Sequence, residues 1–154
     1  MTIYDVLIHE HREVMELIRD LKKTPLTALK KREKLFTKIK NELTSHSRAE
    51  EKVLYSVMEE DKKGRPQALE GDEEHHVLDV LLKEMSKLPV DHERFIAKFE
   101  VMTENLEHHI KEEENEKFAA AKKLISKEEA EEMGLLFKEE KKKILAKLLV
   151  SASK

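Results

Sequence analysis

A histidine followed four residues later by a glutamate occurs twice in the chain, and this repeat constrains the fold more than any other feature. The first copy is His46 with Glu50, and the second, 63 residues later, is His109 with Glu113. Residues four apart on an α-helix lie on the same face, one turn above the other. Each copy therefore predicts an imidazole and a carboxylate directed at one point. Two such helices facing each other would form a metal site.

Apolar residues recur with helical spacing in four segments, which are separated by breakers at residues 24–25, 63–66 and 88–89. The second segment, for example, carries Phe36, Ile39 and Leu43 in steps of three and four. The chain has only three glycines and three prolines, and 41% of its residues are charged, which is typical of amphipathic helices. Because short connections make consecutive helices antiparallel, we predict an all-α fold, an up-down-up-down four-helix bundle.

A fifth helix is predicted after the bundle. Ser126 and Glu129 have the spacing of a capping box, and Ala130, Met133 and Phe137 continue a helical apolar stripe beyond it. A chain of 154 residues suits one hydrophobic core. We expect a bundle over residues 1–125 and an additional C-terminal helix over residues 126–154, packed on the same domain or on a second subunit of a homo-oligomer.

The composition excludes several functional classes. The chain has no cysteine, so disulfides, thiolate metal sites and cysteine nucleophiles are absent. Its net charge is -3, and the basic residues are interspersed with acidic ones, which argues against nucleic acid as a partner. No apolar stretch approaches the roughly 20 residues of a membrane span. We therefore expect a soluble, cytoplasmic protein with no membrane partner.

Six polar residues occupy positions on the predicted buried faces, and together they come from all four bundle helices. A buried imidazole or carboxylate without a partner costs several kcal/mol. Antiparallel packing places the six at similar heights, where glutamates on nonadjacent helices can bridge two cations. Nitrogen and oxygen ligands of this kind favour a pair of first-row transition metals, iron first, with zinc or manganese as alternatives. The predicted metal ligands are His11, His46, Glu50, His75, His109 and Glu113.

The order and spacing of these motifs over about residues 1–125 resemble the hemerythrin-like HHE cation-binding family. The motifs that carry the resemblance are His11-Arg12-Glu13-Val14, His46 with Glu50, Glu74-His75, and His109 with Glu113. The resemblance implies a hemerythrin-like bundle with a non-haem centre of two iron ions joined by an oxo or hydroxo bridge. It also implies that the four histidines are terminal ligands and the two glutamates are bridges.

The chain departs from the oxygen-carrying hemerythrins at two positions. Those proteins place a second histidine four residues after the first on the third helix, where this chain has Asp79. A carboxylate there can be a seventh ligand, or it can leave one metal with an open position. They also place the carboxylate of the fourth helix five residues after its histidine, which would select Glu114 instead of Glu113.

We do not expect the remaining histidines, or the two aromatic residues that follow the repeated motifs, to bind metal. An aromatic residue, Tyr55 or Phe118, lies nine positions after each motif histidine, and we interpret both as core residues, with a pocket beside the metals as the alternative. The remaining histidines lie off the buried stripes and are expected to be solvated or to support the ligands: His9, His76, His92 and His108.

The leading functional hypothesis is a metal-binding protein with a di-iron centre that binds or senses O2 or a related small oxidant. Two alternatives are an iron-buffering or iron-sensing module and a di-iron enzyme that acts on peroxide or nitric oxide. The sequence favours a binding protein over an enzyme. The expected partner is O2 or a similar small ligand.

Overall fold

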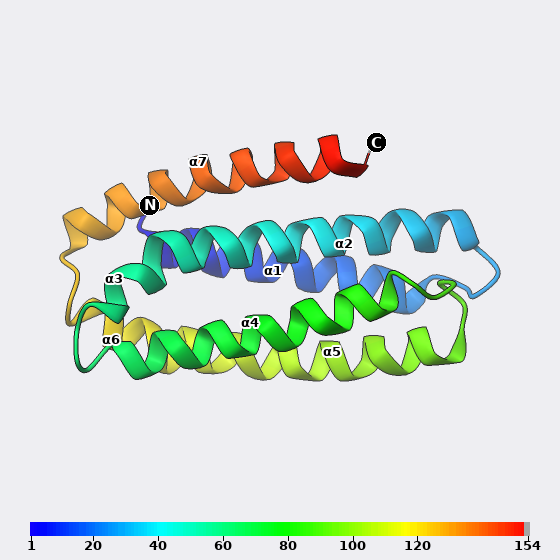
Figure 1. Cartoon of the computed structure of the whole chain (residues 1–154), viewed down its shortest axis with the longest axis horizontal. Coiled ribbons are helices and arrows are strands. Elements are labelled where there is room, and N and C mark those ends of the chain that lie inside the picture. The colour runs from blue at the N-terminus through cyan, green and yellow to red at the C-terminus, as the bar shows by residue number, and fades with distance from the viewer. Residues whose placement is uncertain (153–154) are drawn as a thin grey trace.

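The computed structural model describes residues 1–152 of the chain and shows helices joined by short turns. Within this part, all regular elements are helical, as Figure 1 shows. The elements in chain order are α1 (Ile3–Lys23), α2 (Leu29–Glu50), the π-helical turn η1 (Glu51–Tyr55), α3 (Ser56–Glu59), α4 (Arg65–Met85), α5 (Glu93–Glu112), η2 (Glu113–Lys117), α6 (Phe118–Lys122) and α7 (Lys127–Ala152).

The bundle contains four antiparallel rods, because α2 continues through η1 into α3 and α5 continues through η2 into α6 (Figure 1). The all-α prediction and the up-down-up-down bundle with an added C-terminal helix are confirmed. One buried residue joins two loops at the same end of the bundle: the Arg32 guanidinium donates to the carbonyl oxygens of Thr24, at 3.0 Å, and Val90, at 2.9 Å. This contact joins the loop after α1 to the loop after α4.

Each HxxxE motif is followed by a π-helical turn. In a regular α-helix, a residue five positions after Glu50 would lie about 140° away around the axis. The wider turn η1 returns Tyr55 to the inward face, where it is fully buried. The turn η2 begins at Glu113 and precedes the buried Phe118. The two π turns therefore allow an aromatic ring and a carboxylate to share the interior at this level.

Two apolar clusters lie on either side of the polar residues in the bundle. One cluster includes Leu7, Leu54 and Phe118, and the other includes Ile18 and Phe95. The predicted metal ligands lie between these clusters along the bundle axis.

Helix α7 packs against α1 and α2 along one side of the bundle (Figure 1). It begins with the predicted capping box, in which the backbone N–H of Glu129 donates to the Ser126 hydroxyl at 3.1 Å. A Cβ atom at Gly134 would lie 2.9 Å from the carbonyl oxygen of Met1. Glycine is therefore required at this position for α7 to approach the start of α1 so closely.

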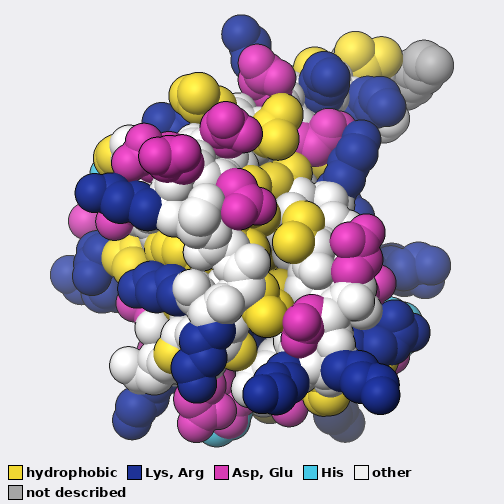
Figure 2. Space-filling model, turned by 90° about the vertical axis from the view of Figure 1, so that its left-hand side faces the viewer, with side chains coloured by type: hydrophobic (Ala, Val, Ile, Leu, Met, Phe, Trp, Pro, Cys, Tyr) yellow, Lys and Arg dark blue, Asp and Glu magenta, His cyan; other side chains and the backbone are white. Residues whose placement is uncertain are grey.

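The charges on the surface are mixed. Figure 2 shows basic and acidic side chains interspersed over one end of the bundle. Among the helices that the structure describes, none is long and apolar enough to span a bilayer.

Candidate metal centre

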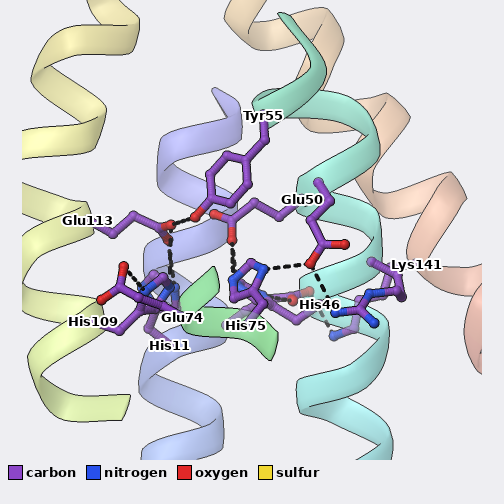
Figure 3. Close-up of polar contacts among 12 residues, drawn as sticks. His11, His46, Glu50, Tyr55, Glu74, His75, His109, Glu113 and Lys141 are labelled. Carbon is purple, nitrogen blue, oxygen red and sulfur yellow. Dashed lines mark hydrogen bonds and ion pairs between the residues drawn. The ribbon is translucent and has the colours of Figure 1, made fainter. Parts of the chain in front are cut away.

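The structure brings all six predicted ligands together in the bundle interior, where none is more than 8% exposed. Figure 3 shows the histidine rings on one side of the cluster and the carboxylates of Glu50 and Glu113 on the other. Two groups of three have ligand atoms within 4.8 Å of one another. The first group is His11, His46 and Glu113, and the second is Glu50, His75 and His109.

We call α1 and α2 the first helix pair, and α4 and α5 the second. Each glutamate lies between a histidine of the first helix pair and a histidine of the second. Glu50 Oε1 is 3.8 Å from His46 Nε2 and 3.2 Å from His75 Nε2. The same relation holds for the other glutamate, whose carboxylate oxygens lie 3.2 Å from His11 Nε2 and 3.5 Å from His109 Nε2. Both carboxylates can therefore contact two cations, one held by each histidine pair.

Every one of the four histidines has a carboxylate at its outer ring nitrogen. These Nδ1 contacts are His11 with Glu114 at 2.8 Å, His46 with Glu10 at 2.9 Å, His75 with Glu51 at 2.7 Å, and His109 with Glu74 at 3.0 Å. A carboxylate accepts the proton on Nδ1, so each neutral ring presents the lone pair of Nε2 to the interior. This is how metal-binding histidines are usually oriented.

Sequence analysis did not predict these four carboxylates as a set, although a signal exists. Two of them immediately precede the histidines of the first and third bundle helices, and the other two immediately follow the motif glutamates. The twofold repeat of the sequence therefore extends to the groups that orient the ligands. The carboxylate of Glu51, for example, accepts from Nδ1 of His75.

Three of the four carboxylates also contact a cation. Glu51 is 2.9 Å from Arg48 Nη2, and Glu74 is 3.6 Å from Nζ of the buried Lys117. These cations partly neutralise the negative charge of the two carboxylates. The third contact joins Glu10 to Lys141 of α7, with a distance of 2.8 Å between Oε2 and Nζ.

In the metal-free site, the pKa values of the two central carboxyls are shifted in opposite directions. Burial raises the pKa of the Glu50 carboxyl well above its usual value, and the charge of Glu113 adds to this effect. Burial acts in the same direction on Glu113, but the close contact with His11 and the charges of His109 and His11 outweigh it and hold the pKa of Glu113 well below its usual value.

The two histidines of the first helix pair also differ. Burial lowers the pKa of His46 to about 4. Burial also disfavours the charged form of His11, but contacts with Glu113 and Glu114 overcome it and raise the pKa of His11 to about 9. At neutral pH, the metal-free site therefore retains a proton on His11, and the burial of Glu50 shifts its carboxyl toward the protonated form.

The inward-facing atoms of the cluster have no hydrogen-bond partner. They are His11 Nε2, His46 Nε2, His75 Nε2, both carboxylate oxygens of Glu50, and Glu113 Oε1. An unsatisfied buried polar group costs about 1–3 kcal/mol. The donor set and its unpaired atoms therefore fit a pair of metal cations.

The structure places the alternative ligands elsewhere. Asp79 Oδ2 lies 2.8 Å from Arg48 Nη2, in an ion pair between α2 and α4. Glu114 lies against the outer nitrogen of His11. A third acidic group, composed of Glu70, Glu74 and Glu112, is partly exposed, and Lys117 Nζ lies 2.9 Å from Glu70. This lysine already provides the positive charge that a cation would supply.

The four other histidines lie outside the cluster. His9 and His108 each pair with a glutamate four residues later on the same helix, at 2.9 and 3.0 Å. His92 caps the start of α5, where its Nδ1 accepts from the backbone N–H of Arg94. His76 is not among the buried residues. Sequence analysis did not predict the capping role of His92.

Tyr55 belongs to the buried apolar core, as predicted, and it also contacts the cluster directly. Its hydroxyl donates to Glu113, and its ring stacks on His75 with a centroid distance of 5.4 Å. Gly71 provides the space, because a Cβ atom there would lie 2.5 Å from the Tyr55 ring. Phe118 packs instead against Tyr4 in the core, with a centroid distance of 5.1 Å.

We expect Gly71→Ala to destabilise the metal-free protein by about 1–3 kcal/mol, because the added methyl group must displace the Tyr55 ring from Glu113. The direction of this change in stability is informative, because helix propensity alone favours alanine over glycine by about 1 kcal/mol and would predict a gain. Urea denaturation measures the change. A gain in stability would show that Tyr55 is not fixed against α4.

A cavity of about 20 Å³ lies beside the histidine rings. Each of the four bundle helices contributes one apolar residue to its wall, three positions from the histidine of that helix: Val14, Leu43, Leu78 and Leu106. Glu10 and Glu42 belong to its polar side. A space of this size holds about one molecule as small as water. The cavity therefore admits only a very small ligand next to the cluster.

A four-helix bundle with histidines and glutamates directed into its core is an architecture of helical metal-binding proteins. The sequence matches the family described as Hemerythrin HHE cation binding domain over residues 2–121. The chain belongs to this family, and its resemblance to the family is thereby confirmed.

One solved structure shows the same fold over nearly the whole chain. It is the crystal structure of a hemerythrin HHE cation binding domain-containing protein from Mycobacterium kansasii, which has 24% sequence identity and a TM-score of 0.82. The alignment covers 97% of this chain and 91% of that one, so the fifth helix also has a counterpart in the overall fold. No curated protein matches the chain significantly.

Proposed function

We propose that the protein binds two iron ions between its helix pairs and that this centre binds or senses O2 or a related small oxidant. One ion would lie between His11 and His46, and the other between His75 and His109. Glu50 and Glu113 would bridge them. The observation that carries the proposal is the convergence of buried nitrogen and oxygen atoms that lack hydrogen-bond partners.

The residues around the cluster fit this function. When bound, an iron pair supplies electrons and an open coordination position for a small oxidant. The four outer carboxylates fix the tautomer and direction of each histidine, so the ligands are arranged before the metal arrives. Tyr55 places a hydroxyl donor against Glu113 inside the buried cluster.

The cavity favours a small-molecule ligand over a larger substrate. It lies directly against the histidine rings, and its opposite wall is apolar. A ligand of one or two heavy atoms fits this space, whereas an organic substrate does not. We therefore favour binding of a small oxidant over turnover of an organic molecule.

Anaerobic titration with ferrous iron tests the proposal. We expect saturation at about two equivalents, followed on exposure to air by near-ultraviolet absorption from a coupled ferric pair. The control is the same titration of a His46→Ala, His109→Ala variant, which removes one nitrogen ligand from each ion. Zinc binding with no uptake of iron would contradict the proposed cofactor.

Iron affinity should fall as the pH is lowered from 8 to 6. The pKa of His11 is raised to about 9, so its ring holds a proton in the metal-free protein at neutral pH, and burial shifts the pKa of Glu50 upward as well. A proton on a ligand atom must leave before that atom can bind a cation. Calorimetry in buffers of different ionisation enthalpy should detect the release of at least about one proton per chain. Binding that releases no protons would contradict this assignment.

A further inference from the structure

Helix α7 lies outside the part of the chain that matches the family, yet it contacts the candidate metal centre at two points. Phe137 is fully buried, and its ring meets the edge of the His46 ring at a centroid distance of 5.7 Å. Four residues later, Lys141 Nζ lies 2.8 Å from Glu10 and 2.7 Å from Glu42. One face of α7 therefore touches both the ring of His46 and the carboxylate that orients it.

The contact with Glu10 continues to the candidate ligand. Glu10 uses one oxygen for Lys141 and the other for His46 Nδ1, at 2.9 Å. Figure 3 shows Lys141 on the side of the cluster where His46 lies. A chain of ammonium, carboxylate and imidazole thus connects α7 to the interior.

The second helix pair has a similar chain of contacts, but its lysine has a different origin. His109 contacts Glu74, which in turn contacts Lys117 of η2. The twofold sequence repeat relates Lys117 to the position of Leu54, which is an apolar core residue. The first pair therefore has no lysine from its own repeat, and α7 supplies one. The same arrangement arises twice from unrelated segments, which favours a role in the site over a chance surface contact.

Lys141 also holds two carboxylates together. Glu10 and Glu42 come from α1 and α2, and both belong to the polar side of the cavity beside the histidines. Without the ammonium group between them, their like charges would repel each other. Glu10 would then turn toward solvent and release the His46 ring, because within residues 1–152 its carboxylate is held by Lys141 and His46.

We propose that α7 is a component of the metal centre, in which Phe137 and Lys141 are positioning residues that hold His46 and control how firmly the ion between His11 and His46 is retained. This inference rests on the proposed two-iron site. It predicts that the two ions respond differently to changes in α7, because the second pair takes its lysine from within the bundle.

The test compares the release of ferrous iron to a coloured chelator under anaerobic conditions. In Lys141→Met, one of the two irons should leave at least about tenfold faster than from the unmodified protein, and the other should leave at the unmodified rate. Lys142→Met is the matched control, because the neighbouring lysine is exposed on the same helix and its loss removes the same charge. Its release should not change.

A double variant separates positioning by charge from simple packing. Adding Glu42→Gln to Lys141→Met removes the repulsion, so Glu10 can return to His46 and slow release should be largely restored. Melting of the metal-free variants verifies that each remains folded. Failure of Glu42→Gln to restore retention would overturn the proposed role of the carboxylates.

Two other outcomes are distinguishable. If the unmodified protein binds two irons and Lys141→Met retains both equally well, the role of α7 is refuted while the proposed function stands. If the unmodified protein binds no iron, both are refuted together.

Discussion

Replacing Glu50 by methionine is expected to stabilise the metal-free protein and to prevent it from binding two irons. The carboxyl group is fully buried, and neither of its oxygens has a hydrogen-bond partner. Methionine has a similar volume and no group that requires a partner. The free energy of unfolding should therefore rise by about 1–3 kcal/mol. For a chain of this size, each kcal/mol raises the melting temperature by about 2–4 °C.

The control for this prediction is Glu107→Met, because Glu107 is exposed on α5. Its effect on stability should be close to zero, and iron binding should be unchanged. Opposite effects of Glu50→Met on stability and on iron content would show that this glutamate is maintained for metal binding at a cost to the fold. Loss of stability in the metal-free Glu50→Met variant would show instead that the carboxyl group supports the core.

Loading with iron should raise the melting temperature by about 8–16 °C for each site filled to a thousand times its dissociation constant. Ligands that bind only the folded state add about 4 kcal/mol at that ratio, and each kcal/mol raises the melting temperature by about 2–4 °C. Here the bound ions would also satisfy the unpaired atoms of the interior. Calorimetric scans of chelator-treated and iron-loaded protein measure the shift.

The Glu50→Met variant serves as the control for the loading experiment as well. Its melting temperature should respond much less to iron, because a bridging ligand is missing. An equal response in both proteins would place the stabilising ions at another site. A shift below about 2 °C in the unmodified protein, with two irons bound, would contradict the link between the site and the fold.

The helical period made much of this fold predictable from sequence. Steps of three and four residues identify the inward face of each helix without knowledge of its neighbours, and His46 and Glu50 share a face for purely local reasons. Antiparallel connections then bring the four faces together. For this reason the sequence predicted the bundle and the six residues that the structure gathers in its interior.

Features that depend on contacts between distant segments could not be predicted in this way. Lys141 reaches Glu10 across 131 residues of sequence, and only the placement of α7 brings them together. The π turn η1 has no composition signal, yet it decides that Tyr55 faces Glu113 and not the opposite side of the helix. Asp79 pairs with Arg48 because α2 and α4 are neighbours, which the spacing of residues within one helix does not reveal.

The most direct test is a crystal structure of iron-loaded protein with anomalous diffraction measured at the iron absorption edge. Two peaks are expected inside the bundle, one contacted by His11 and His46 and the other by His75 and His109, with the two glutamates between them. A single peak among the partly exposed acidic residues of α4 and α5, or an interior with no iron, would contradict the metal centre described here.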